Sequence, residues 1–289
     1  MRVLVTGGAG LVARHLVRSA PTGCEIVVTW RSAPPPSGPT AHRVELSDAS
    51  AVSRVLDEVR PDVVVHTAYS MSARSDVVDA TAAVAAAAAS VGAALVHLSS
   101  DMVFDGGAAP YLEDDVPAPV NDYGRWKLEA EQLASAAVPD ATVTRTSLVV
   151  ASDPPDHQTR WLGRALASGD PVTLFHDEYR TPVRADDLAA ALWVLAGAAP
   201  GAGGTVLDRA ERAGPWHLPG PERLSRAGLG RRVATVWGMD VGGIRTASAA
   251  EHPEPRPRDL SLASLRQGSL GIGWRPVPPE GAGPPAAGW

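Results

Sequence analysis

A tyrosine and a lysine four residues apart are the first candidates for chemistry in this sequence. Tyr123 and Lys127 share one face if their segment is helical. An ammonium group on that face favours the phenolate, lowers the tyrosine pKa from its ordinary value of about 10, and can also hold a ribose hydroxyl. The pair therefore predicts a tyrosine that acts as a general acid.

A serine cluster stands upstream of this pair. Ser99, Ser100 and Asp101 directly follow the hydrophobic run Leu95–Leu98, which is typical of a buried strand. Open α/β sheets place their ligands at the carboxyl ends of their strands. We therefore expect a serine hydroxyl there to bind the oxygen of a substrate.

A glycine-rich turn opens the chain. Gly7, Gly8 and Gly10 come directly after the strand pattern Val3–Val5, at the start of a helical pattern. The free amide groups of such a helix start, with its partial positive charge, favour a pyrophosphate. The turn predicts a dinucleotide site at Gly7, Gly10, Leu11 and Val12, although turns of this kind also occur for packing alone.

The end of the second expected strand bears on which dinucleotide binds. No acidic residue is present there to accept from a ribose 2′-hydroxyl, whereas Arg31 and Ser32 can meet a 2′-phosphate. This favours NADPH, with NADH as the alternative, unless Arg31 is only a solvated loop residue. Asp48, after the third strand, either contacts adenine or caps the next helix.

The elements that must position these residues alternate along the first half of the chain. Strands are expected at 3–5, 25–29, 42–46, 63–65 and 95–98, with helices at 11–19, 51–59, 77–91 and 123–137. This βαβ series predicts an α/β fold of the Rossmann type, a doubly wound parallel sheet over residues 1–150.

The second half is less regular. We expect a strand at 141–150, then a smaller substrate-binding lobe over 151–275 that partly returns to the Rossmann core. Within that lobe, helices are expected at 186–195 and 221–237 and a strand at 216–218. The segment 276–289 is rich in Pro and Gly and is expected to be a flexible tail.

Composition excludes several classes of function. The 289 residues carry a formal charge of −6, which argues against a nucleic-acid or anionic membrane partner. The single cysteine, Cys24, permits no internal disulfide, and the amino terminus does not resemble a secretory signal. The sequence therefore favours a cytoplasmic protein, and it allows a homodimer.

Together these motifs resemble the extended short-chain dehydrogenase/reductases, and within them the dTDP-4-dehydrorhamnose reductase group of sugar-nucleotide reductases. The motifs that carry the resemblance are Thr6–Gly10, His97–Gly106, Tyr123 with Lys127, Thr144–Ser147, Thr181–Val183 and Asp186–Leu188. The resemblance covers the chain to about residue 270.

The resemblance implies hydride transfer from a nicotinamide to the keto group of a nucleotide-linked 4-keto-deoxysugar. Tyr123 would give the proton, Ser100 would take the Ser/Thr position, and Lys127 would fix the nicotinamide ribose. It also implies that Thr67, Ala68 and Tyr69 line the cofactor. The residues that it implies near the substrate are Ser100, Asp101, Met102 and Leu148.

Some features limit this assignment. Leu148 stands where the rhamnose reductases usually have an aromatic residue, so the substrate is either a related sugar or a non-sugar ketone or imine. A non-catalytic dinucleotide-binding regulatory subunit is a further alternative. Arg145 and Arg184 either bind a substrate diphosphate or pair with Asp186 and Asp187. Arg14 and His15 stand where some members carry metal-binding acids, so we expect no metal.

Overall fold

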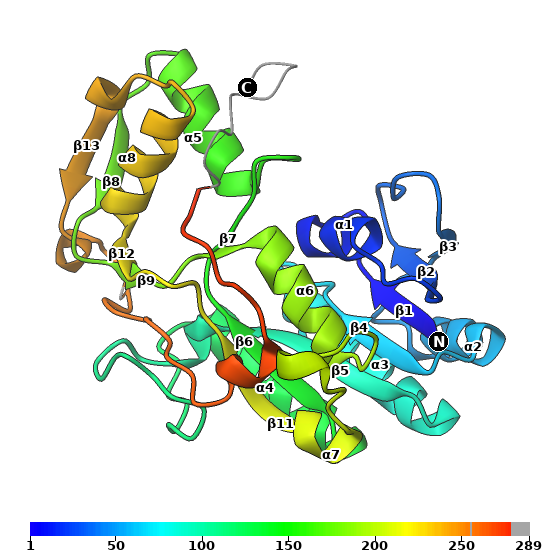
Figure 1. Cartoon of the computed structure of the whole chain (residues 1–289). Helices are drawn as coiled ribbons and strands as arrows, with labels where there is room; N and C mark the ends of the chain where they lie inside the picture. The colour runs from blue at the N-terminus through cyan, green and yellow to red at the C-terminus, as the bar shows by residue number, and fades with distance from the viewer. Residues whose placement is uncertain (255, 279–289) are drawn as a thin grey trace.

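A parallel sheet of seven strands forms the centre of the molecule (Figure 1). It belongs to a computed structural model that describes residues 1–254 and 256–278. In spatial order the strands are β11 (Gly214–Leu218), β6 (Thr142–Thr146), β5 (Ala94–Ser100), β4 (Val63–His66), β1 (Arg2–Thr6), β2 (Glu25–Trp30) and β3 (Thr40–Arg43). All neighbouring pairs are parallel, which confirms the expected doubly wound sheet.

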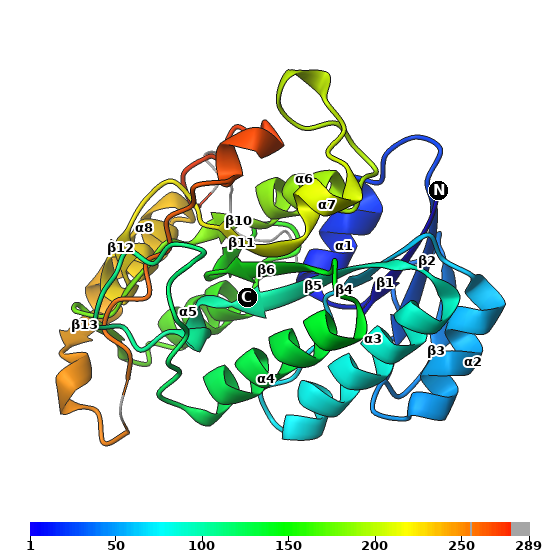
Figure 2. The same ribbon diagram turned by 90° about the horizontal axis from the view of Figure 1, so that it is seen from below.

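Helices cover both faces of this sheet (Figure 2). Alternate side chains of β1 explain this, because Val3 and Val5 enter one core while Leu4 enters the other. The first core is closed by α1 (Leu11–Arg18) and α6 (Ala185–Leu195). The second is closed mainly by α2 (Ala49–Val59) and α3 (Val78–Val91), and α4 (Asp122–Ala137) packs beside α3 on the same face.

The strand order reverses next to β1. The chain builds β2 and β3 outward on one side of β1, then crosses over to place β4, β5 and β6 on the other. In such sheets the crevice outside the carboxyl ends of the strands, at this reversal, is the usual ligand site. The glycine turn after β1 and the serines at the end of β5 both lie at that edge.

A second lobe stands beside the carboxyl edge of the sheet (Figure 1). It contains α5 (His157–Ala167), β8 (Val172–Phe175), α8 (Arg226–Val236) and β13 (Ile244–Ala247), and β8 pairs with β13. Its buried core includes Leu162, Val233 and Val277. The first residues of the predicted tail are thus packed against this lobe, and residues 279–289 lie outside the described part of the chain.

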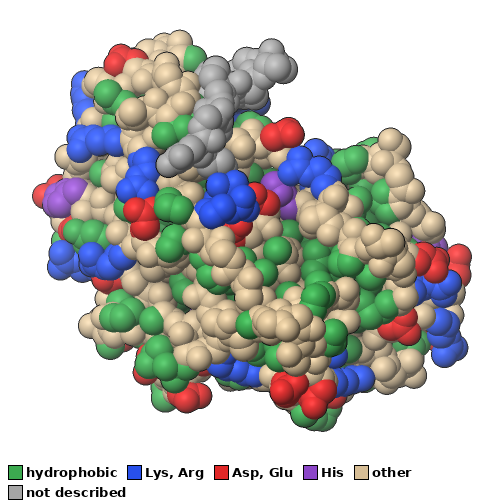
Figure 3. Space-filling model, viewed as in Figure 1, with side chains coloured by type: hydrophobic (Ala, Val, Ile, Leu, Met, Phe, Trp, Pro, Cys, Tyr) green, Lys and Arg blue, Asp and Glu red, His purple; other side chains and the backbone are tan. Residues whose placement is uncertain are grey.

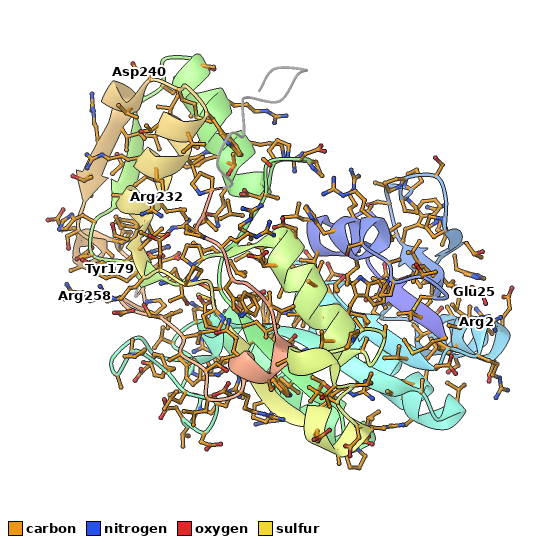
Figure 4. The ribbon with its side chains drawn as sticks, viewed as in Figure 1. Arg2, Glu25, Tyr179, Arg232, Asp240 and Arg258 are labelled. Carbon is orange, nitrogen blue, oxygen red and sulfur yellow. The ribbon has the colours of Figure 1, made fainter. Side chains whose placement is uncertain are left out.

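Short elements join the lobe to the sheet domain. They are β7 (Val149–Val150) with β10 (Val183–Arg184) and β9 (Tyr179–Arg180) with β12 (Leu224–Ser225), whereas the short helix α7 (Arg209–Arg212) belongs to the sheet domain and precedes β11. The 3₁₀ turns are η1 (Arg74–Asp76), η2 (Asp101–Val103), η3 (Ala202–Gly204), η4 (Val241–Gly243), η5 (Ala249–Glu251) and η6 (Gln267–Leu270). Figure 4 shows Tyr179 and Arg258 near this junction, whereas Arg2 and Glu25 mark the amino end of the sheet.

Two expected elements were wrong, and the others agree within three residues. The strand expected at 141–150 ends at Thr146, because the chain leaves the sheet there and Val149–Val150 pairs with β10 instead. The helix expected at 221–237 begins at Arg226, because Leu224–Ser225 pairs with β9 and the Ser225 hydroxyl caps the helix.

Charged side chains of both signs lie on the surface. On the face drawn in Figure 3, Lys and Arg side chains are scattered among Asp and Glu. Within the described residues, none of the helices is both long and apolar enough to cross a membrane.

Candidate active site

One large cleft runs along the carboxyl edge of the sheet and between the sheet and the lobe. Its volume is about 1040 Å³, at the upper end of the range of about 300–1,000 Å³ that is usual for ligand sites. The sequence-predicted residues that line it are Gly7, Gly10, Leu11, Val12, Arg31, Ser32, Thr67, Ala68, Tyr69, Ser100, Asp101, Met102, Tyr123, Lys127 and Leu148. Asp48 and Arg184 are not part of the lining.

The glycine turn has no room for side chains. Gly7 has a φ of +73°, and a Cβ there would lie 3.0 Å from the Ala68 Cα. A Cβ on Gly8 would lie 2.8 Å from the Val28 Cβ. Gly10 begins α1 and supplies no side-chain cap to its first N–H groups. A bare helix start beside a turn without side chains fits the diphosphate of a dinucleotide.

The segment after β4 is held against β1. The Thr6 hydroxyl accepts hydrogen bonds from the backbone N–H groups of Thr67 and Ala68, both at 3.1 Å, and the Thr67 hydroxyl donates to the Thr6 carbonyl at 2.7 Å. These contacts fix the chain direction, so that Tyr69 projects over the cleft with 54% of its surface exposed.

Arg31 and Ser32 lie at the far end of the cleft, where β2 ends. The Arg31 guanidinium is not free, because its Nη1 lies 2.6 Å from Asp76 Oδ1 and 3.7 Å from Glu45 Oε2. The Arg31 side chain is thus ion-paired at the rim of the cleft, and 52% of it is exposed.

Asp48 caps a helix. Its carboxylate accepts from the Ser50 hydroxyl at 2.7 Å and from the N–H groups of Ser50 and Ala51, both at 3.0 Å, and these bonds, the hydroxyl bond most of all, hold its pKa below the usual value. Of the two roles considered for this residue, the structure supports the cap, since satisfying the first N–H groups of α2 turns the side chain away from the cleft.

Ser100, Tyr123 and Lys127 all line the cleft. The Asn121 side chain caps α4 by accepting from Gly124 N at 2.8 Å, and a Cβ on Gly124 would lie 2.1 Å from the Met102 carbonyl oxygen. This close approach presses the start of α4 against the end of β5. The side chains of Ser100 and Tyr123 both line the cleft at this contact.

Lys127 is buried one helical turn further along. Its Nζ donates to the Leu98 carbonyl at 3.0 Å and lies 4.9 Å from the centre of the Tyr69 ring. Burial lowers the pKa of Lys127 to about 8. The centres of the Tyr69 and Tyr123 rings lie 6.1 Å apart.

The tyrosine pKa differs from the expectation. We expected Lys127 to lower the pKa of Tyr123. Burial instead raises that pKa well above 10.0, with a further increase from the charges of Tyr69 and Asp101, and the Ser100 hydrogen bond acts in the opposite sense. Lys127 does not lower the pKa of Tyr123, because its ammonium group donates to the Leu98 carbonyl instead. A protonated phenol is the form that a proton donor needs.

Asp101 links the sheet to the lobe. It is 3% exposed, accepts from the Ser147 hydroxyl at 2.8 Å, and lies 3.5 Å from Arg180 Nε. Burial raises its pKa, and the Arg180 charge opposes this. Because Asp101 adjoins Ser100, this ion pair fixes the end of β5 against the lobe.

Arg184 and Arg145, the two candidates for binding a substrate diphosphate, both pair with carboxylates of the chain. Arg184 pairs with Asp186 at 2.9 Å at the start of α6, outside the cleft, so its assignment as a substrate-binding residue is wrong. Arg145 is 6% exposed and pairs with the buried Glu131 at 2.8 Å. Its guanidinium lies over the Phe104 ring at 5.2 Å, which is a structural role.

The residues that sequence reasoning missed form a charged cluster on the lobe side of the cleft. Glu178 is 2% exposed and is surrounded by Arg180 at 3.1 Å, Arg226 at 3.8 Å and Arg256 at 2.7 Å, all of which line the cleft. No spacing rule joins these residues, because their elements meet only through the packing of the lobe.

Comparison with known proteins agrees with this geometry. Residues 1–267 match the family described as RmlD substrate binding domain, and the chain belongs to that family. It is similar to the probable low-salt glycan biosynthesis reductase Agl14 of Haloferax volcanii, with 31% identity over 94% of this chain and 93% of the relative. A dTDP-4-dehydrorhamnose reductase of Mycobacterium tuberculosis is 33% identical over 93% of this chain and 86% of the relative.

Another relative is named as a subunit of an enzyme and not as a reductase. The methionine adenosyltransferase 2 subunit beta of Bos taurus is 30% identical over 95% of this chain and 84% of its own length. Among solved structures, a hypothetical dTDP-4-dehydrorhamnose reductase from Sulfolobus tokodaii is similar with a TM-score of 0.80 and 25% identity, over 96% of this chain and 98% of that one. The Bacillus anthracis dTDP-4-dehydrorhamnose reductase, solved in complex with NADP, shares the fold with a TM-score of 0.77 and 21% identity over 94% of each chain.

Proposed function

We propose that this protein is an NADPH-dependent reductase of a nucleotide-linked 4-keto-deoxysugar. The observation that carries the proposal is that Ser100, Tyr123 and Lys127 line the same cleft as the glycine turn. The reductase names of the relatives and the NADP complex of the Bacillus anthracis protein support it.

The cofactor would lie along the cleft from Arg31 to Lys127. The bare helix start at Gly10 would hold the diphosphate, Arg31 and Ser32 the 2′-phosphate, and Thr67 with Lys127 the nicotinamide half. A bound nicotinamide supplies the hydride that goes to the carbonyl carbon.

The chain's own residues supply the proton. The Ser100 hydroxyl holds the carbonyl oxygen, and the Tyr123 phenol, kept protonated by its raised pKa, donates its proton to that oxygen as the alcohol forms. Solvent then returns a proton to the Tyr123 phenolate.

The charged cluster supports a substrate with a diphosphate. Three guanidinium groups, from Arg180, Arg226 and Arg256, face two carboxylates, from Asp101 and Glu178, so this cluster carries one more positive than negative charge (3 − 2). Guanidinium groups bind phosphate oxygens with two parallel hydrogen bonds. The nucleotide would thus lie along the lobe, with the sugar between Leu148 and Tyr123.

Two observations favour other functions. A small apolar pocket beside Leu148, lined by Leu162, Leu229 and Val233, would suit a non-sugar ketone or imine with an apolar group. The relative named methionine adenosyltransferase 2 subunit beta favours a regulatory subunit that binds the dinucleotide without turnover.

The test is NADPH oxidation with a panel of keto-sugar nucleotides, ketones and imines. Tyr123→Phe should lower kcat by on the order of 100-fold or more while leaving NADPH binding in place. Tyr179→Phe is the matched control, because this tyrosine lies outside the cleft lining. Turnover of ketones or imines alone would exclude the sugar substrate, and tight NADPH binding without turnover of any compound would favour the regulatory subunit.

A further inference from the structure

The adenosine end of the cleft holds a cation that is already paired on two sides. Arg31 Nη1 lies 2.6 Å from Asp76 Oδ1 and 3.7 Å from Glu45 Oε2, and all three residues line the cleft. The Arg31 and Glu45 side chains are about half exposed, at 52% and 47%, whereas Asp76 is 16% exposed. The Arg31–Asp76 pair is therefore the tighter and the more enclosed of the two.

The pair joins two sides of the cleft. Arg31 follows β2, whereas Asp76 lies in η1 (Arg74–Asp76), between β4 and α3. The apolar side chains of Val44, Leu46 and Ala80 line the same end of the cleft. This combination of an apolar wall and a charged rim suits a nucleobase with its ribose.

The two possible dinucleotides would meet this arrangement differently. A 2′-phosphate carries up to two negative charges near neutral pH, so it must compete with the Asp76 carboxylate for the same guanidinium. A ribose 2′-hydroxyl carries no charge, and a carboxylate can accept its hydrogen bond, which is the part an acidic residue plays in NAD sites.

We propose that Asp76 is a specificity-determining residue that weakens the preference of this site for a 2′-phosphate. The inference rests on the proposed dinucleotide function and adds a residue to it. Arg31 attracts the 2′-phosphate, Asp76 and Glu45 offset part of that attraction, and the protein accepts both NADPH and NADH with a small difference in affinity. Removing the charge of Asp76 makes the site selective for the phosphate.

Calorimetric titration with 2′,5′-ADP and 5′-AMP tests this without any turnover. Asp76→Asn should raise the affinity ratio of 2′,5′-ADP to 5′-AMP by on the order of fivefold. Asp79→Asn is the matched control, because Asp79 pairs with Arg74 at 3.1 Å and lies outside the cleft lining. In the control the ratio should stay within a factor of two of wild type.

The possible outcomes distinguish a failure of the proposed dinucleotide function from a failure of the inference about Asp76. If the wild type binds neither fragment, the proposed dinucleotide function fails and the inference falls with it. If it binds them and Asp76→Asn leaves the ratio unchanged, the inference about Asp76 is overturned while the proposed function stands. If Asp76→Asn does not fold, Glu45→Gln should raise the ratio in the same direction by a smaller factor, and no rise would overturn the inference.

Discussion

Replacing Lys127 with methionine should make the protein more stable at neutral pH while abolishing its reductase activity. Lys127 is 3% exposed, and burial lowers its pKa from 10.5 to about 8. This difference corresponds to about 3 kcal/mol against the charged form in the folded state. Methionine has a similar length and carries no charge, so the variant avoids this cost.

A hydrogen bond offsets part of the gain. Lys127 Nζ donates to the Leu98 carbonyl at 3.0 Å, and losing such a bond costs about 1 kcal/mol. The net increase in the free energy of unfolding at pH 7 is therefore about 1 to 2 kcal/mol. The same change removes an ammonium group from the cleft lining, where the proposed function assigns it to the nicotinamide half of the cofactor, so NADPH oxidation should be lost.

The pH dependence isolates the charge. Because the folded-state pKa of Lys127 lies below its unfolded value, the unfolded chain binds more protons between about pH 8 and 10.5. The stability of the wild type should consequently rise by about 2 kcal/mol relative to Lys127→Met as the pH goes from 7 to 10. Other groups that titrate in this range are common to both proteins and cancel in the difference.

The assay is urea unfolding of both proteins at pH 7 and pH 10 without cofactor, together with NADPH oxidation. The reasoning is refuted if Lys127→Met is less stable than wild type at pH 7 and the difference between the two proteins does not change with pH. A stable variant with wild-type kcat would instead remove Lys127 from the proposed cofactor site.

Two other changes separate structural from binding roles. Arg145→Met should lower the free energy of unfolding by about 3 to 5 kcal/mol, because it leaves the buried carboxylate of Glu131 without its partner, and urea unfolding that shows a loss below about 1 kcal/mol would contradict this. Gly7→Ala should weaken NADPH binding, followed by fluorescence titration, by on the order of tenfold, because the new Cβ would lie 3.0 Å from the Ala68 Cα in a left-handed backbone. Gly92→Ala has the same φ of +73° with open space around it, so it should cost similar stability while leaving binding unchanged.

The sequence predicted the parts of the site that depend on local rules. The glycine turn, the four-residue spacing of Tyr123 and Lys127, and the serines at the end of a strand are each readable within one element and its neighbour. The parallel sheet then brings their carboxyl ends to one edge, since its topology follows from alternating strands and helices. These residues do line a common cleft.

Contacts between distant segments were not predictable in the same way. Arg180 and Arg256 are separated by 76 positions (256 − 180) and approach each other through Glu178, which no periodic pattern indicates. The break after Thr146 has a similar cause, because a β-branched run continues in sequence while tertiary pairing with β10 redirects the chain. The effect of burial on the Tyr123 pKa likewise depends on the finished packing.

These contacts give the sheet domain and the lobe different roles in the cleft. The sheet domain supplies the proton donor, whose position depends on the close approach of Gly124 to the Met102 carbonyl, and the lobe supplies the positive charge around Glu178. The Asp101–Arg180 pair joins them directly, one peptide bond from Ser100. The geometry of Ser100 and Tyr123 is fixed from the sheet side. Substitutions in the lobe that leave Arg180 in place should therefore have a larger effect on substrate selectivity than on the rate of proton transfer.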